Sequence, residues 1–138
     1  SGVQGPRAAI NHGLKGLQIS ASAWTAEALK LTMPASVFSR STECHNQDKV
    51  SMGTIAARDC LRVIELTEQV AAALLIAVRQ GVWLRCRLNR SVAPEASLKN
   101  MMEALAADIA EIGEDRRLEP DLRLLLERIR DRVWKLYE

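Results

Sequence analysis

The amino-acid sequence predicts an all-α protein without a β-sheet. Apolar residues recur every three or four positions, which is the spacing of one helix face and not the alternation of a half-buried strand. Proline and glycine fall between these periodic stretches, where turns are expected. The stretch 50–87 contains no proline, so it can form one very long helix. We predict four helices in a single domain, a long one with shorter helices packed on it.

The first predicted helix covers Gly13–Leu31. Its apolar residues cluster on a helical wheel, at Leu14, Leu17, Trp24, Ala28 and Leu31. Pro34 lacks a backbone N–H and disfavours helix in the residue before it. We therefore expect a loop over Thr32–Asn46.

The second predicted helix runs from Val50 to Arg87. At 1.5 Å per residue it would reach about 50 Å, which exceeds the diameter expected of a globule of this size. Its middle, Val70–Val78, is apolar on nearly every side, which in a water-soluble protein means burial on all sides. We expect other chains, or other parts of a longer chain, to supply the missing cover.

Two shorter helices complete the predicted fold. Pro94 and Glu95 suit the first turn of a third helix that ends near Gly113. Pro120 suits the first turn of a fourth helix that runs to Tyr137. Both sequences have the apolar spacing of amphipathic packing helices.

Composition excludes several functional classes. Nineteen basic and seventeen acidic residues leave a formal net charge of +2, too small for the concentrated positive field that nucleic acids require. The longest apolar run, Val70–Val78, is too short to span a bilayer. Cys44, Cys60 and Cys86 are odd in number and widely spaced, which favours neither a disulfide framework nor a zinc site. We expect a cytoplasmic protein that binds neither membrane nor nucleic acid.

A crowded polar stretch, "STECHNQDKVSMGT" at 41–54, comes directly before the long helix. A metal site and a Cys/His nucleophile pair are both disfavoured, because Cys44 and His45 are adjacent and cannot easily converge on one atom. The third interpretation is a polar loop at a helix N-terminus with Asp48 as its cap. Asn46 and Gln47 add two neutral amides where one cap would suffice, which favours a further role.

Three stretches carry a family resemblance: "HGLKGLQISASAWTAEALKL", "ECHNQDKVSMGTIAARD" and "EDRRLEPDL". They resemble the ammonia-lyases and aminomutases of histidine, phenylalanine and tyrosine, which use a methylidene-imidazolone (MIO) electrophile. The resemblance covers the whole chain but only the C-terminal part of a family member. It implies a single all-helical segment over 1–138, within a helical-bundle homotetramer of the fumarase/aspartase-like superfamily. Its parts are a helix with an active-site loop (1–46), the long core helix (47–90) and the C-terminal helices (91–138).

The resemblance also assigns roles to the polar stretch. In the phenylalanine and tyrosine branch the loop reads Glu-x-His-Asn-Gln-Asp, whereas the histidine branch has a carboxylate at the place of Gln47. An aromatic substrate, phenylalanine or tyrosine, is therefore favoured over histidine. The resemblance implies that Glu43, Asn46 and Gln47 are catalytic. It implies that His45 contributes to substrate binding, either directly or by orienting the loop.

The "GLKG" stretch resembles the plant-type "GFKG" of the same family. The resemblance places Lys15 near the substrate and Ile19, one helical turn later, in the pocket for the aromatic ring. Without the resemblance, an exposed lysine and a core isoleucine would explain both residues. Both interpretations stay open at the level of the sequence.

The MIO group forms from an Ala-Ser-Gly triplet, and the 138 residues contain none. We therefore expect the rest of the enzyme to supply the group, and we expect this chain to be inactive by itself. The expected partners are an aromatic amino acid, the N-terminal part of the enzyme and further copies of it. An aminomutase on the same scaffold is the alternative activity. A helical oligomerisation module without catalysis is the alternative from a different class.

Overall fold

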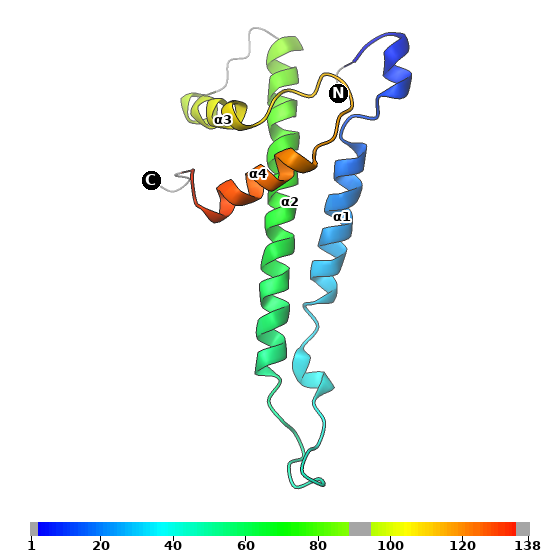
Figure 1. The fold of residues 1–138 in the computed structure, drawn as a ribbon, viewed down its shortest axis with the longest axis vertical. Helices are drawn as coiled ribbons and strands as arrows, with labels where there is room; N and C mark the ends of the chain where they lie inside the picture. The colour runs from blue at the N-terminus through cyan, green and yellow to red at the C-terminus, as the bar shows by residue number, and fades with distance from the viewer. Residues whose placement is uncertain (1–2, 89–94, 135–138) are drawn as a thin grey trace.

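The computed structural model describes residues 3–88 and 95–134, and within them the protein is all-α, as predicted (Figure 1). The long helix α2 forms the axis, and the shorter helices pack on it. The elements in chain order are η1 (Pro6–Ile10), α1 (Lys15–Lys30), η2 (Ala35–Phe38), α2 (Gly53–Leu88), α3 (Ala96–Asp108) and α4 (Glu119–Arg130). An isolated antiparallel bridge, Thr42 with Gln47, is the β-type pairing found among the described residues.

The helices α1 and α2 form an antiparallel hairpin whose two ends are built differently (Figure 1). The turn that precedes α1 places Gly13 at a φ of 62°, a left-handed backbone that glycine adopts without strain. The helix then begins at Lys15, within two residues of the predicted start. We call the end of the hairpin near Lys15 the packed end, and the opposite end, with the loop between α1 and α2, the open end.

The helix α2 has 36 residues and is about 54 Å long at 1.5 Å per residue. It begins at Gly53, three residues after the predicted start at Val50. The reason is that the Val50 N–H donates to the Ser39 hydroxyl at 2.9 Å, and this hydroxyl donates to the Val50 carbonyl at 2.7 Å. Ser39 is buried, so these bonds fix residue 50 in the neck of the loop.

The third helix is shorter than predicted. It begins at Ala96 after Glu95, and Pro94 lies outside the described residues. It ends at Asp108 and does not continue to Gly113, because the chain becomes extended at Ile109.

A side chain of α2 holds the extended segment that follows α3. The side-chain amide of Gln80 donates to the Ile112 carbonyl at 2.9 Å and accepts from the Ile112 N–H at 3.0 Å. This pair uses the backbone groups that a continued helix would need, and Ile109 and Ile112 are both buried.

The fourth helix begins where predicted, with proline in its first turn, and ends earlier than predicted. Arg132 takes a left-handed φ of 51°, and the Val133 N–H bonds back to the Arg128 carbonyl at 3.1 Å. This is a common way for a helix to end. Tyr137, the predicted end, lies outside the described residues.

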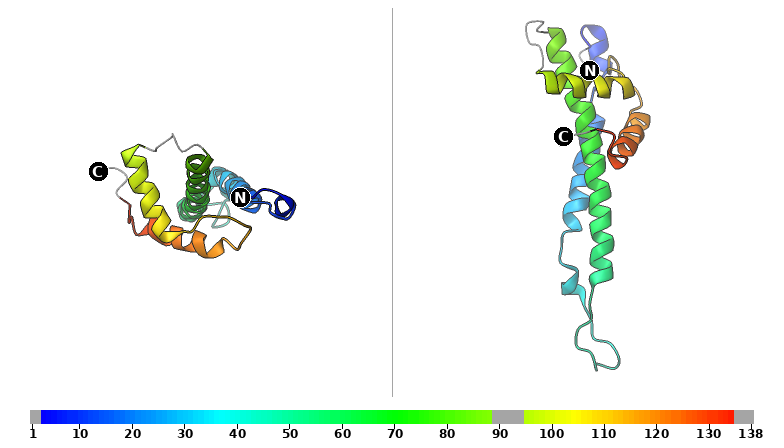
Figure 2. Two further views of the ribbon diagram at one scale, coloured as in Figure 1. Left: turned by 90° about the horizontal axis from the view of Figure 1, so that it is seen from above. Right: turned by 90° about the vertical axis from the view of Figure 1, so that its left-hand side faces the viewer.

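The hydrophobic core lies at the packed end, where α3 and α4 pack on α2 at the level of the first half of α1 (Figure 2). Its buried members are Leu17, Ala72, Ala73, Ile76, Leu105, Ile109, Ile112 and Leu125. Towards the open end α2 is largely uncovered, with Leu61 63% exposed. The predicted burial of Val70–Val78 on all sides holds for one face only, since Leu74 and Val78 are exposed in this chain. Among the described helices, none combines the length and the apolar character needed to cross a membrane.

Candidate functional site

The polar stretch forms a tight turn at the tip of the open end, which we call the polar turn (42–47) (Figure 1). The Thr42 N–H donates to the Gln47 carbonyl at 3.0 Å, and the Gln47 N–H donates to the Thr42 carbonyl at 3.3 Å. The Thr42 hydroxyl also donates to the side-chain oxygen of Gln47 at 3.0 Å. All residues from Thr42 to Lys49 are exposed in this chain. The turn is therefore internally bonded and faces outwards.

The backbone of the polar turn is left-handed at three consecutive residues other than glycine. The φ angles are 52° at Glu43, 53° at Cys44 and 68° at His45. Such conformations cost on the order of 1–2 kcal/mol for each residue, and they persist where the surrounding bonds enforce them. The Asn46 N–H closes the turn on the Glu43 carbonyl at 3.0 Å.

The predicted catalytic residues lie together in this turn. The Asn46 amide donates to the Glu43 carboxylate at 3.4 Å, and Gln47 directs its side-chain oxygen to Thr42. His45 pairs through Nδ1 with the Ser41 hydroxyl at 2.7 Å. That bond suits the interpretation in which the imidazole orients the loop. The turn thus presents one carboxylate and two amides, groups that can bind an ammonium and a carboxylate.

The prediction that Asp48 caps the long helix is wrong. The helix α2 begins five residues later, at Gly53, whose N–H donates to the Ser51 hydroxyl at 3.3 Å. The amides of the polar turn therefore do not lie directly at the positive end of α2. They are fixed instead by the bonds of the turn and by the Ser39–Val50 pair in the neck of the loop.

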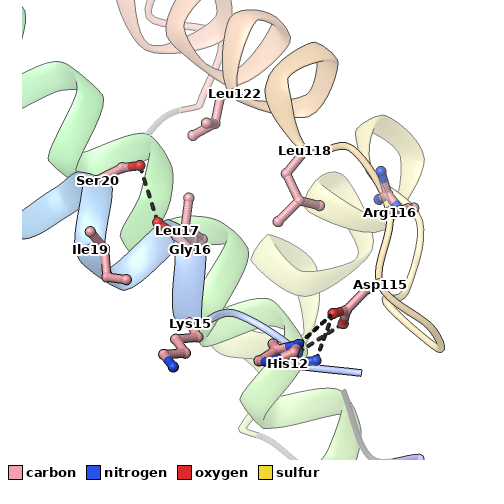
Figure 3. Close-up of a pocket in the computed structure, with 11 residues that line it drawn as sticks. His12, Lys15, Gly16, Leu17, Ile19, Ser20, Asp115, Arg116, Leu118 and Leu122 are labelled. Carbon is pink, nitrogen blue, oxygen red and sulfur yellow. Dashed lines mark hydrogen bonds and ion pairs between the residues drawn. The ribbon is translucent and has the colours of Figure 1, made fainter. Parts of the chain in front are cut away.

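The other two predicted residues, Lys15 and Ile19, lie at the packed end, on the wall of a groove of about 540 Å³ (Figure 3). We call it the α1 groove. Its wall also contains His12, Gly13, Gly16, Leu17, Ser20, Asp115, Arg116, Leu118 and Leu122. Lys15 is exposed and Ile19 is 56% exposed, so both side chains are accessible. The groove combines a cation with apolar walls.

Asp115 closes one edge of the α1 groove, a role that we did not predict from the sequence (Figure 3). Its carboxylate accepts from the His12 N–H at 2.6 Å and from the Gly13 N–H at 2.8 Å. The first of these bonds is the main cause that lowers the pKa of Asp115 below its ordinary value. The "EDRRLEPDL" stretch was the available signal, but a contact over 103 residues cannot be read from local spacing.

The two groups of predicted residues are not brought together within one copy of the chain. The α1 groove is lined by residues at the start of α1. The polar turn lies beyond the other end of this helix (Figure 1). The 16 residues of α1 span about 24 Å, at 1.5 Å per residue, and the polar turn lies beyond that span. One aromatic amino acid cannot contact both places in a single copy. Among the described residues, no group of three or more His, Cys, Asp or Glu could hold a metal ion.

Fold and site together define the class of protein, an all-helical bundle. The polar turn exposes one carboxylate and two amides at the open end, and the α1 groove has a lysine on its wall at the packed end. The family follows from comparison with known proteins. Residues 3–107 match the aromatic amino acid lyase family, and the chain belongs to that family.

Two relatives show the range of the similarity. The chain is 35% identical over 131 residues to a histidine ammonia-lyase from Caenorhabditis elegans, covering 94% of this chain and 19% of the relative. It is 37% identical over 122 residues to a tyrosine ammonia-lyase from Cereibacter sphaeroides, covering 88% of this chain and 23% of the relative.

Solved structures agree with this assignment. A histidine ammonia-lyase from Trypanosoma cruzi matches with a TM-score of 0.79 at 28% identity, over 91% of this chain and 24% of that one. A tyrosine aminomutase matches with a TM-score of 0.76 at 31% identity, over 94% of this chain and 23% of that one. The chain thus spans about a fifth to a quarter of the length of these proteins.

Proposed function

We propose that the chain supplies part of the active site of an ammonia-lyase that acts on an aromatic L-amino acid. In this reaction the Cα–N bond breaks and a proton leaves Cβ, which gives an arylacrylate and an ammonium ion. The polar turn is the observation that carries the proposal. It holds a carboxylate, Glu43, and two amides, Asn46 and Gln47, in a bonded and exposed arrangement within a chain of the aromatic amino acid lyase family.

The groups of the polar turn match the polar half of an amino acid. The Glu43 carboxylate can accept hydrogen bonds from the substrate ammonium, and amide N–H groups can donate to its carboxylate. Donors that are fixed before the substrate arrives need no reorganisation during the reaction. The bonds from Thr42 and the left-handed backbone supply this rigidity.

Phenylalanine or tyrosine is the proposed substrate, in preference to histidine. Gln47 presents a neutral amide where a carboxylate would attract an imidazolium ring. The similarity to both histidine and tyrosine ammonia-lyases supports only the wider class of aromatic amino acids. The identity of residue 47 carries the narrower choice.

The α1 groove is proposed to bind the remainder of the substrate, with Ile19 against the aromatic ring and Lys15 near the carboxylate. Because the groove and the polar turn are separated by the length of α1, we propose that the groove of one copy and the polar turn of another copy contact the same substrate. A homotetramer in which several copies complete each site meets this requirement. Exposed apolar residues on α2, such as Leu61 and Leu74, supply surface for such packing.

The chemistry of this chain does not fit formation of the MIO group. That electrophile requires an Ala-Ser-Gly triplet, which the 138 residues lack. We therefore assign no step of the reaction through it. In our proposal the group belongs to another polypeptide segment, and the chain alone does not catalyse the elimination. Its three cysteines are odd in number and widely spaced, which fits a reducing compartment, and we propose the cytoplasm.

Two alternatives have observations of their own. The similarity to a tyrosine aminomutase supports an enzyme that returns the amine to Cβ, and the residues described here serve either outcome equally well. The uncovered apolar face of α2 supports a helical oligomerisation module without chemistry. Sedimentation tests the oligomerisation module, because a chain that stays monomeric at high concentration would contradict a packing role.

The test begins with the intact mass of every polypeptide in the purified preparation, followed by assays with phenylalanine, tyrosine and histidine. We expect an additional polypeptide mass, release of ammonia and formation of an arylacrylate from phenylalanine or tyrosine. A preparation that contains the complementary mass but releases ammonia from none of the three would contradict the proposed function. Formation of a β-amino acid would identify the aminomutase.

A further inference from the structure

The connection between α3 and α4 reaches across the molecule to the beginning of α1, 103 residues away in sequence (Figure 3). Asp115 lies at the point of contact. Besides the two bonds that its carboxylate accepts, the Asp115 N–H donates to the side-chain oxygen of Asn11 at 2.6 Å. Both the backbone and the side chain of Asp115 therefore bind the 11–13 segment.

These bonds define the conformation of the turn that leads into α1. Gly13 has a φ of 62°, and its N–H is one of the two that Asp115 accepts. The N-cap residue Leu14 makes no side-chain cap bond, so the helix has no capping side chain of its own. Lys15 follows immediately as the first helical residue. Any movement of the turn would therefore move Lys15.

We infer that Asp115 is a positioning residue for the substrate groove, because it holds the His12–Gly13 turn and through it fixes the direction of Lys15. This inference rests on the proposed function. Asp115 does not need to contact the substrate itself. Its neighbour Arg116 also lies on the groove wall, and its guanidinium donates to the Asp121 carboxylate at 2.5 Å. The residue that follows Asp115 is therefore fixed as well.

The test compares two adjacent carboxylates in the intact enzyme. Asp115→Asn keeps the shape, but it leaves a single acceptor oxygen and turns an amide N–H group towards a backbone donor. Glu114→Gln is the matched control, since Glu114 also contacts the N-terminal segment, through an exposed ion pair with Arg7 at 2.5 Å. For Asp115→Asn we expect KM to rise about tenfold with kcat changed less than about twofold. Glu114→Gln should leave both near the wild-type values.

Asp115→Glu restores the carboxylate and is expected to recover most of the lost affinity. It also keeps the test decisive if Asp115→Asn folds poorly. A merely structural role would lower the amount of folded enzyme without raising KM. The inference is overturned if Asp115→Asn and Glu114→Gln have the same KM, or if Asp115→Glu recovers folding without recovering KM.

A second measurement does not depend on turnover. Acylation of Lys15, followed by mass spectrometry, reports how the amine is placed. We expect Asp115→Asn to change the rate of acylation at least threefold and Glu114→Gln to leave it unchanged. A wild-type enzyme that acts on none of the three amino acids contradicts the proposed function alone. In that case an equal rate of Lys15 acylation in both variants overturns the inference, and a selective change in Asp115→Asn supports it.

Discussion

The two ends of the α1–α2 hairpin differ in how they are stabilised. At the packed end α3 and α4 cover α2, the core residues are buried, and Asp115 connects segments that are far apart in sequence. At the open end the polar turn depends on bonds between near neighbours, and the adjacent part of α2 is exposed. The chain therefore buries the packed end by itself, whereas in our proposal additional polypeptide contacts the open end.

Under the proposed function, this difference assigns stability to the packed end and chemistry to the open end. A packed core requires apolar residues from several helices, and the packed end has them in α1, α2, α3 and α4. A site for an amino acid requires accessible polar groups held in fixed directions, and the polar turn has them. Substitutions at the first place should change folding, whereas those at the second should change turnover.

The largest expected effect is on folding at the packed end. Leu125 is fully buried in the core, so Leu125→Ala should lower the free energy of unfolding by about 2–5 kcal/mol. The matched variant Leu61→Ala, at a residue 63% exposed in this chain, should change it by less than about 0.5 kcal/mol. Urea unfolding of the 138-residue chain measures both values. Equal losses would mean that the open end is covered within the chain.

The next effect is on turnover at the open end. Gln47→Ala or Glu43→Ala in the intact enzyme should lower kcat/KM about 100-fold, because each removes a fixed polar group from the proposed site. The thermal transition should stay nearly unchanged, since both residues are exposed. Gln18→Ala, at an exposed glutamine of α1, is the control. Loss of the thermal transition with normal turnover per folded enzyme would show a structural role instead.

A smaller effect tests the left-handed backbone of the polar turn. Cys44→Gly should stabilise the turn by about 0.5–1 kcal/mol, because glycine adopts a φ of 53° without the clash of a Cβ atom. Cys60→Gly, inside α2 and two turns from its N-terminus, should destabilise by about 1 kcal/mol. Hydrogen exchange at the Asn46 amide reports the first change, and urea unfolding reports the second. The same sign at both cysteines would contradict the account.

The smallest effect concerns pH at the packed end. Hydrogen bonds from His12 and Gly13 lower the pKa of Asp115 below its ordinary value of 3.8. The ionised carboxylate therefore adds stability above that value, and this stability is lost as the pH falls through the lower pKa of the folded state. Asp115→Asn should remove this acid-range contribution, whereas Glu114→Gln should retain it. Thermal unfolding across the acid range measures the difference, and parallel curves for wild type and Asp115→Asn would contradict it.

Much of the fold follows from local sequence rules. Helical periodicity predicts α1 and the great length of α2, and proline predicts the beginning of α4. The errors arise where long-range bonds take over the backbone. Ser39 binds Val50 and delays α2, and Gln80 binds Ile112 and keeps the segment after α3 extended. Neither pairing is visible in the spacing of residues along the chain.

The site shows the same limit. The residues of the polar turn are adjacent in sequence, so their proximity in the structure could be predicted. The role of Asp115 in the groove could not be predicted, because it depends on how the segment between α3 and α4 folds back onto the start of α1. The resemblance placed Lys15 and Ile19 in the same catalytic site as the turn, but the length of α1 keeps them apart within one copy.

Amide hydrogen exchange of the 138-residue chain, alone and in the presence of the complementary polypeptide, tests the central claim most directly. We predict slow exchange in the buried middle of α2 in both samples. We predict fast exchange over the polar turn and the first turns of α2 in the free chain, and strong slowing there once the enzyme is complete. An open end that is already protected in the free chain, or that still exchanges fast in an enzyme that releases ammonia, would contradict the account.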